Sequence, residues 1–93
     1  MKRRSNDLII SQILEICENG AGKTKIVYQA NLNSIKVTQC LTNLIKSGLV
    51  VEIPQGSRVL FKTTFKGMEF RKRYEQLQSE MDELNSTIFE IPA

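Results

Sequence analysis

The 93-residue sequence contains no histidine and no tryptophan, and only two cysteines and two prolines. Without histidine, the chain lacks the side chain that most often serves as a general base and as a metal ligand. Cys17 and Cys40 are too few for a disulfide framework, so we expect buried free thiols. The sequence also has no metal-ligand cluster, and its only candidate nucleophiles, Cys17 and Cys40, are expected to be buried, so it predicts no metal, no cofactor and no enzymatic activity.

Long apolar runs are also missing. No stretch approaches the roughly 18 apolar residues that span a membrane, and the basic start "MKRRSNDLII" lacks the apolar core of a secretory signal. We therefore expect a cytoplasmic protein with no membrane partner. A chain of this length forms one domain, buries only about 60–65% of its unfolded surface, and often gains stability by oligomerising.

Charge is distributed unevenly along the chain. Residues 1–74 carry all 13 Lys and Arg against five acids, a net charge of +8, whereas residues 75–93 carry five acids and no base, a net charge of −5. A basic body favours a polyanionic partner, and the acidic end indicates a separate task.

Hydrophobic periodicity predicts three helices in the first half of the chain. The first covers residues 8–17, the second residues 25–30 with Thr24 as its N-cap, and the third residues 34–47. Each is bounded by Gly or Asn, which commonly end helices.

A hairpin and one more helix follow. The β-rich runs "LVVEI" and "RVLFKT" flank "PQGS" and predict a hairpin with its tip at residues 55–57. A long helix begins near Phe65. The order helix, helix, helix, hairpin, helix predicts an α+β, mostly α, winged helix-turn-helix. Residues 1–64 form its body, and residues 65–93 form a long C-terminal dimerisation helix in the same domain.

The stretch "GAGKT" at residues 20–24 resembles the end of a phosphate-binding loop. Such a loop needs a glycine five residues before its Gly-Lys, where this chain has Cys17, and it must follow a buried strand rather than a helix. We therefore expect no bound nucleotide and interpret the stretch as a helix end followed by a helix start. Lys23 and Lys25 then become candidates for contacting DNA phosphates.

The third predicted helix has one apolar side and one polar side. The polar side contains no acid and is rich in amides, hydroxyls and lysines, which are the groups that read base edges in the major groove. Ile35 also lies on this side, where it could contact a thymine methyl. The candidate DNA-binding residues of this helix are Ser34, Lys36, Thr38, Gln39, Thr42, Asn43 and Lys46. The alternative is the solvated face of an ordinary surface helix.

Further basic residues lie on both flanks of this helix. Arg58 belongs to the predicted hairpin, and Lys2, Arg3 and Arg4 form a basic N-terminal arm. Together with the polar side of the third helix they predict double-stranded DNA as the partner.

The last predicted helix carries apolar residues spaced alternately by four and three positions, the pattern of a coiled coil. This seam consists of Phe70, Tyr74, Leu77, Met81, Leu84, Ile88 and Ile91. We expect Phe65 and Met68, and Phe70 and Tyr74 as an alternative to pairing, to pack on their own body, but the stripe from Leu77 to Ile91 needs a partner helix. Bases crowd the helix start and acids its end, so antiparallel pairing places opposite charges side by side. The sequence thus predicts an antiparallel homodimer.

The run "ILEICENGAGKTKIVYQANLNSIKVTQCLTNLIKSGLV", the hairpin and "TTFKG" resemble a family of small archaeal winged-helix DNA-binding proteins. These are predicted transcriptional regulators that include the "ten-a" chromatin proteins of Sulfolobus, and the resemblance covers nearly the whole chain. It implies that Lys36, Gln39, Thr42 and Asn43 lie on the recognition helix and Arg58 on the wing. It also implies homodimers held by an antiparallel coiled coil of C-terminal helices.

Two functions are compatible with these observations. The first is a homodimeric DNA-binding protein, either a transcriptional regulator or a nucleoid-associated protein of chromatin architecture, with its third helix in the major groove and its hairpin on the flank. The second is a winged-helix protein-interaction module that uses the long helix as a scaffold and binds no nucleic acid. Only the first requires the polar side of the third helix.

Overall fold

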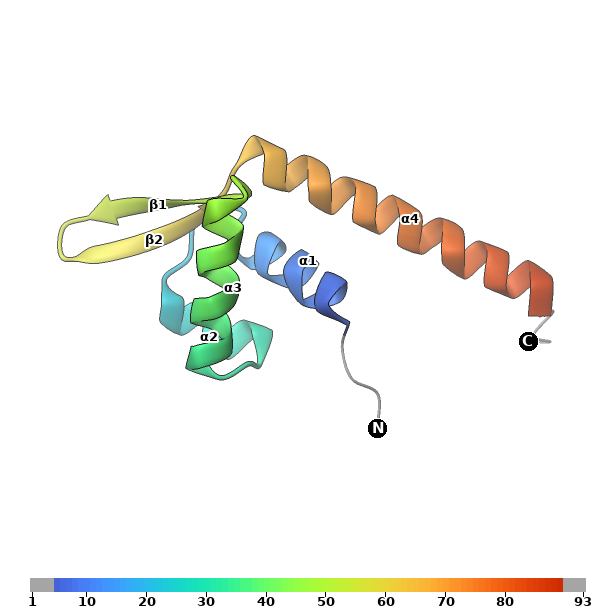
Figure 1. Cartoon of the computed structure of the whole chain (residues 1–93), viewed down its shortest axis with the longest axis horizontal. Helices are drawn as coiled ribbons and strands as arrows, with labels where there is room; N and C mark the ends of the chain where they lie inside the picture. The colour runs from blue at the N-terminus through green and yellow to red at the C-terminus, as the bar shows by residue number, and fades with distance from the viewer. Residues whose placement is uncertain (1–4, 90–93) are drawn as a thin grey trace.

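The structure is a computed structural model that describes residues 5–89, and its elements follow the predicted order (Figure 1). In chain order they are α1 (Asn6–Ile16), α2 (Lys23–Ala30), α3 (Ser34–Lys46), β1 (Val50–Gln55), β2 (Arg58–Thr63) and α4 (Phe65–Phe89). The predicted mostly helical winged helix-turn-helix with a long C-terminal helix is confirmed.

Side-chain caps fix the starts of α1 and α3. The backbone N–H of Leu8 donates to Ser5 Oγ over 3.1 Å, and that of Lys36 donates to Asn33 Oδ1 over 2.8 Å. Each cap satisfies a backbone donor that the first turn of a helix leaves without a partner.

The start of α2 differs from the prediction. The helix begins at Lys23, directly after Gly22, and not after Thr24. The cause is a tertiary contact: Ala21 pairs with Phe61 of β2 through two backbone hydrogen bonds of 3.0 and 2.8 Å. This pairing holds the chain extended up to Gly22, so the helix starts at once and the capping preference of Thr24 is overridden.

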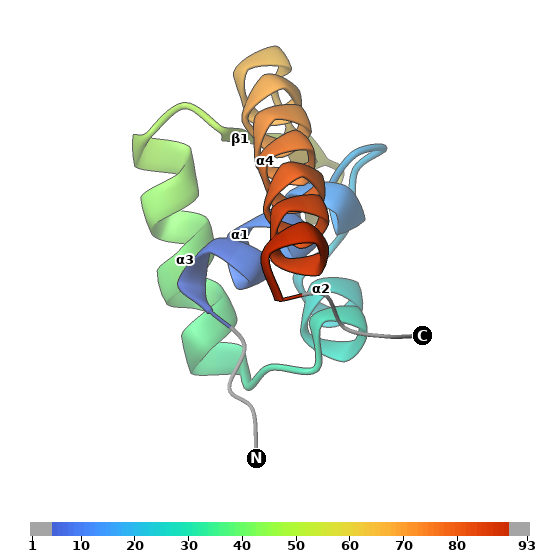
Figure 2. The ribbon, with the colours of Figure 1, turned by 90° about the vertical axis from the view of Figure 1, so that its right-hand side faces the viewer.

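The three N-terminal helices, whose arrangement Figure 2 shows, enclose a small apolar core. α1 runs through the middle of the body and contacts α2, α4 and β2. The largest fully buried side chains are Ile13, Leu14, Cys17, Ile26 and Val37. Burying each of the four aliphatic side chains among them stabilises the fold by about 1.5–3 kcal/mol, so these few residues hold the body together.

The predicted apolar side of the third helix is confirmed for Val37, Leu41 and Leu44, which are buried. Cys40 is an exception to the expectation of two buried thiols. Its side chain is only partly buried, because it lies at the edge of the apolar side of α3.

β1 and β2 form an antiparallel hairpin with its tip where the sequence predicts it. Val50 lies opposite Thr63, and Gln55 lies opposite Arg58, which leaves a two-residue turn. Its first residue, Gly56, has φ +60°, a conformation that two-residue hairpin turns require and that glycine adopts without strain. The hairpin and α4 leave the body in opposite directions (Figure 1).

The first turn of α4 is packed closely onto the segment that follows α3. Thr64 Oγ1 donates to the Gly48 carbonyl over 2.7 Å and accepts the N–H of Gly67 over 3.1 Å, which caps the helix. Gly67 is buried, and a Cβ atom there would overlap the Leu49 carbonyl oxygen and lie 2.6 Å from Thr63 Cγ2. The helix can approach so closely only because this residue lacks a side chain.

Arg71, one turn further along α4, binds α1. Its guanidinium lies 2.9 Å from Glu18 Oε2 and 3.2 Å from Glu15 Oε2, and it lies 3.5 Å from Glu75 Oε2 on its own helix. Isolated surface ion pairs contribute little, but a planar guanidinium shared by several carboxylates forms directional, charge-assisted hydrogen bonds. Arg71 thus helps to fix the direction in which α4 leaves the body.

Beyond the body, α4 continues as an exposed rod. Leu77, Met81, Leu84 and Ile88 are all exposed along it. The prediction that Phe65 packs on its own body is wrong, since its side chain is 81% exposed, whereas Met68 is partly buried as expected. The reason is helical rotation: Gly67 faces the body, and a residue two positions away points to the other side.

No helix within residues 5–89 combines the length and the apolarity that a bilayer span requires.

Replacing Gly67 with alanine should destabilise the protein. Alanine favours helices by about 1 kcal/mol over glycine, but the overlap with the Leu49 carbonyl forces the first turn of α4 away from the body. We expect a net loss of about 2 kcal/mol in the free energy of unfolding, measured by urea unfolding at one fixed protein concentration. Ser79→Ala, at an exposed site of the same helix, is the matched control. Equal stability of both variants would contradict the close packing.

Candidate nucleic-acid interface

α2 and α3 form a helix-turn-helix. The turn between them is short because Asn31 ends α2 in the left-handed conformation, with φ 54° and ψ 49°, which asparagine tolerates better than most residues. Asn33 then caps α3. Since the apolar side of α3 faces the core, its polar side faces solvent.

All seven predicted DNA-binding residues of α3 are exposed. Ile35, which the sequence places on the same side, is 72% exposed at the start of the helix. By helical rotation, Ile35, Gln39 and Lys46 lie nearest the centre of the polar side, with Thr42 beside them. The structure therefore presents this acid-free face to any partner that approaches α3.

Two hydroxyls on this face already donate to the helix backbone. Thr38 Oγ1 donates to the Ser34 carbonyl, and Thr42 Oγ1 donates to the Thr38 carbonyl, both over 2.9 Å. In this arrangement each threonine offers an acceptor oxygen rather than a donor. The amide side chains of Gln39 and Asn43 carry both donors and acceptors, which suits them to bidentate pairing with adenine.

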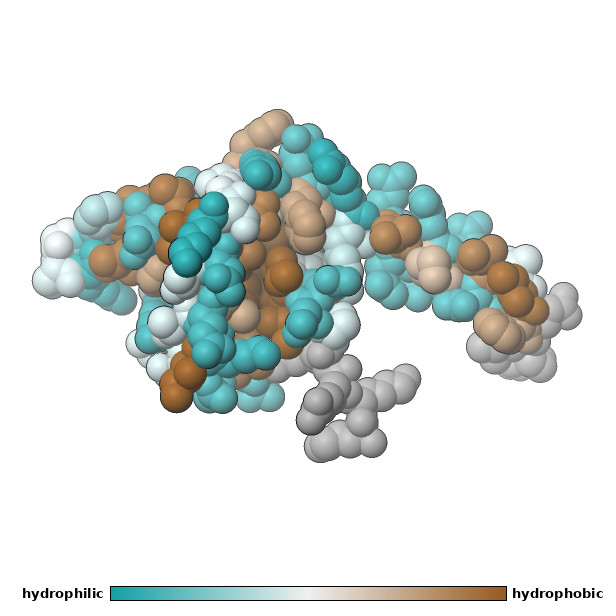
Figure 3. Space-filling view, viewed as in Figure 1, coloured by the Kyte–Doolittle hydropathy of each residue, from teal (hydrophilic) through white to brown (hydrophobic). Residues whose placement is uncertain are grey.

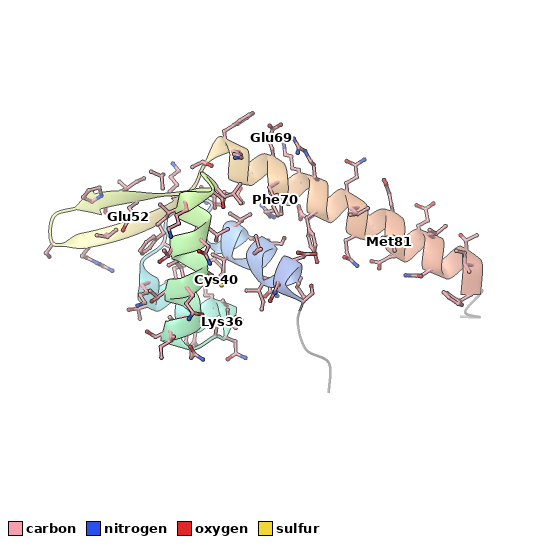
Figure 4. All side chains as sticks on the ribbon, viewed as in Figure 1. Lys36, Cys40, Glu52, Glu69, Phe70 and Met81 are labelled. Carbon is pink, nitrogen blue, oxygen red and sulfur yellow. The ribbon has the colours of Figure 1, made fainter. Side chains whose placement is uncertain are left out.

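Each flank of α3 borders a groove. On the hairpin side, Thr38, Thr42 and Lys46 line a groove of about 430 Å³ together with Lys23 and Glu52. Glu52 is a residue that sequence reasoning missed: it places a carboxylate of β1 beside the polar side of α3 (Figure 4). The β-rich run "LVVEI" predicts only a strand there, so no sequence signal could have revealed this neighbour.

The other flank borders a second groove, here called the α3–α4 groove, of about 400 Å³. It is lined by Asn6, Ile9, Ile10, Lys36, Gln39, Cys40, Asn43, Leu44, Ser47, Leu49 and Phe70. Three of the predicted DNA-binding residues, Lys36, Gln39 and Asn43, thus form part of its rim. Figure 4 shows Lys36 and Cys40 on α3 and Phe70 on α4.

The start of α2 and the hairpin bring three predicted cations together. Lys23, Lys25 and Arg58 line one shallow surface depression with Gly22. The Arg58 guanidinium is close enough that a Cβ at Gly22 would lie 3.8 Å from its Nη2 atom. No side chain caps α2, and the residues of its N-terminus, Gly22 to Lys25, line the same depression. Lysines, an arginine and a helix N-terminus are groups that favour phosphate.

Some candidates are not part of this assembly. Lys2, Arg3 and Arg4 lie outside the described residues. Tyr28 of α2, a lone aromatic that is more often found in a core, is 84% exposed and extends the surface of the helix-turn-helix. The short predicted helix did not show which way Tyr28 points, because Ile26 and Val27 already account for its inward side.

The environment of Cys17 is unsuited to nucleophilic catalysis. Burial raises the pKa of the Cys17 thiol to about 11, although nearby Lys25 lowers this pKa in part. Nucleophilic attack requires the thiolate, which a raised pKa disfavours. Among residues 5–89, no cluster of three or more His, Cys, Asp or Glu is arranged to hold a metal ion.

A helix-turn-helix followed by a β-hairpin, with an exposed polar second helix, defines a winged helix-turn-helix protein. A family model described as winged helix-turn-helix matches residues 3–82, and the chain belongs to that family. Among curated proteins no match is found.

Solved structures with the same fold include DNA-binding proteins. Sso10a-2, a DNA-binding protein from Sulfolobus solfataricus, matches with a TM-score of 0.84 and 26% identity over 95% of this chain and 93% of that one. This match confirms the resemblance to small archaeal winged-helix DNA-binding proteins. MepR, a transcription regulator of the Staphylococcus aureus multidrug efflux pump MepA, matches with a TM-score of 0.75 and 16% identity over 89% of this chain and 64% of that one. PcaV, a transcriptional regulator from Streptomyces coelicolor, matches with a TM-score of 0.68 and 18% identity over 98% and 64%. The last two matches show the fold alone.

The two thiols should differ sharply in reactivity. At pH 8 only about one Cys17 side chain in a thousand would be ionised, and it is buried, whereas Cys40 is partly exposed. We expect a disulfide reagent to modify one thiol per folded chain and the second only after unfolding, as followed by absorbance. In Cys40→Ser the folded protein should show no rapid reaction. Rapid modification of that variant without unfolding would contradict the assignment.

Proposed function

We propose that the protein is a homodimeric DNA-binding protein that places α3 in the major groove and the β1–β2 hairpin on the flank. The observation that carries this proposal is the acid-free, exposed polar side of α3 beside the cations grouped at the start of α2 and on the hairpin. The fold is similar to that of DNA-binding transcription regulators, which supports it. We further propose that it acts on the nucleoid in the cytoplasm, as a transcriptional regulator or a chromatin-architecture protein.

The charged residues would position the protein on DNA. Lys23, Lys25 and Arg58 would contact successive phosphates, assisted by the uncapped N–H groups of α2. Each phosphate that is neutralised releases a counterion, which makes the affinity depend strongly on salt. We also propose that Lys2, Arg3 and Arg4, as an N-terminal arm, add phosphate contacts.

Residues of α3 would read the bases. Gln39 and Asn43 offer amides for adenine, and Ile35 offers an apolar contact for a thymine methyl. Lys46 would contact guanine or a phosphate. Ser34, Lys36, Thr38 and Thr42 would surround these contacts, the two threonines accepting hydrogen bonds rather than donating them.

The dimer would form along α4. Its seam residues Leu77, Met81, Leu84 and Ile88 are exposed in a single chain, and an apolar stripe of this kind on a soluble protein needs a cover. Phe70 and Tyr74 continue the seam toward the body, and Ile91 lies outside the described residues. Pairing is proposed to be antiparallel, because the basic start of each α4 then lies beside the acidic end of the other.

Removing the cations at the start of α2 should weaken the salt dependence of DNA binding. For a random duplex of about 30 bp, log affinity should fall linearly with log salt with a slope of about −4 or steeper. The double substitution Lys23→Ala/Lys25→Ala should reduce the steepness of that slope by about 2, since it removes two phosphate contacts. Fluorescence anisotropy across a salt series measures both values.

Two further variants test whether the salt dependence comes from the cations at the start of α2. Lys72→Ala removes one charge from the exposed surface of α4 and should leave the slope unchanged. Gln39→Ala should alter sequence preference while retaining the slope, because an amide contacts bases and not counterions. If the unmodified protein binds no duplex even at low salt, the DNA-binding proposal fails and the protein-interaction module takes its place.

A charge in the seam should separate the dimer. Leu84→Glu places a carboxylate in the apolar stripe, so we expect a monomer by size-exclusion chromatography with light scattering at concentrations where the unmodified chain is a dimer. Glu83→Gln, beside the seam, should remain dimeric. Far-UV circular dichroism should show that the body of the Leu84→Glu variant keeps its helices. A dimer that survives Leu84→Glu would place the interface elsewhere.

A further inference from the structure

The α3–α4 groove has an apolar floor that is open to solvent among residues 5–89. Ile9 and Ile10 of α1 line it, together with Leu44 and Leu49 and the aromatic ring of Phe70. In Figure 3 the space between α3 and the start of α4 shows a hydrophobic surface framed by hydrophilic residues of α3. An exposed apolar hollow of this kind indicates a binding partner.

The apolar stripe of α4 leads into this groove. Phe70 belongs both to the seam and to the groove lining. Figure 3 shows the hydrophobic residues of the α4 rod on the same face of the molecule as the groove, and Figure 4 shows Phe70 and Met81 along that rod. Phe70 therefore connects the seam to the groove, and both lie on the face of the molecule that Figure 3 shows.

We propose that the tip of the partner's α4, around Ile88 and Phe89, docks in the α3–α4 groove. The occupant is thus a second copy of this chain, and the inference rests on the antiparallel homodimer proposed above. Both residues are exposed in the single chain, where Ile88 is 59% and Phe89 69% accessible.

Helix geometry brings this tip to the groove. From Phe70 to Ile88 the seam covers 18 residues, or about 27 Å at 1.5 Å per residue. When two such seams overlap fully in antiparallel orientation, the partner's Ile88 lies opposite Phe70. Because Phe70 forms one wall of the groove, the next residues of the partner meet the groove itself.

Charge favours this side of α4 over the opposite one. The polar residues that line the α3–α4 groove include Lys36 and no acid. The hollow between α1 and α4, which the seam residue Tyr74 also borders, is lined by Glu15, Glu75 and Asp82, with Arg71 already bound to the two glutamates. A partner helix whose distal half carries Glu80, Asp82 and Glu83 is repelled there and attracted to the groove.

This contact would join dimerisation to DNA recognition. The groove wall opposite Phe70 consists of α3 residues, among them Cys40 and the rim residues Lys36 and Asn43. The partner's tip would support α3 from the side that faces away from the hairpin. The recognition helix of each body would then be held in place by the other chain.

The natural thiol of Cys40 makes the contact measurable. Leu84→Cys, Ile88→Cys and Phe89→Cys are each introduced singly, and the protein is treated with a mild oxidant or with a short bismaleimide, which covers Cα distances beyond the ~7 Å limit of a disulfide. Cross-links are detected by non-reducing gel electrophoresis. Ile88 lies about 27 Å from Phe70 along one helix, so a link to Cys40 can form only between chains. Cys17 is buried and its thiol does not compete.

We expect Ile88→Cys or Phe89→Cys to shift the protein from the monomer band to the linked-dimer band. The shift should be lost in the matching variant that also carries Cys40→Ser. Asp82→Cys, on the α1 side of α4, is the control that should not link to Cys40.

The remaining outcomes each overturn the proposal in a distinguishable way. If light scattering shows a dimer but neither Ile88→Cys nor Phe89→Cys gives a Cys40-dependent link, the groove takes another occupant and the proposed dimer stands. A link of Ile88→Cys or Phe89→Cys that persists in Cys40→Ser reveals parallel tips that meet each other. A protein that stays monomeric overturns both the groove contact and the homodimer.

Discussion

The close contact between Gly67 and the Leu49 backbone determines how the two parts of this molecule are joined. With no side chain between them, the first turn of α4 lies directly on the chain that leaves α3. Thr64 caps the helix at this point and also holds the Gly48 carbonyl. The direction of the rod is therefore set by backbone packing at the end of the α3 helix, so a change in the position of α3 would be transmitted to α4.

Basic and acidic residues lie on different parts of the surface, which the net charge of the chain does not show. Arg71 meets three carboxylates, Glu15, Glu18 and Glu75, so this part of the α1–α4 contact is acidic in balance. The cations at the start of α2 and on the hairpin have no ion-pair partner among the interactions of residues 5–89 and gather on a different surface. Opposite charges thus lie on different sides of one small body, which would orient the protein in the field of a polyanion.

Most of the fold could be predicted from the sequence because its signals are local. Helical periodicity, with Gly or Asn at the helix ends and a turn at residues 55–57, placed the helices and the hairpin. The start of α2 could not be predicted, since the pairing of Ala21 with β2 joins segments about 40 residues apart. The candidate site also has a predictable and an unpredictable part. The polar side of α3 follows from the period of one helix, whereas the position of Glu52 beside it depends on how the hairpin packs.

α4 is a spacer whose length can change only in fixed increments if the apolar stripe is to stay in line. Adding seven residues would lengthen the helix by about 10.5 Å and keep the apolar stripe almost in line, because seven residues are close to two full turns. Adding one residue would lengthen it by only about 1.5 Å but rotate everything beyond it by about 100° and break the stripe. A helix of this kind can therefore change the separation of the parts at its two ends only in whole heptads.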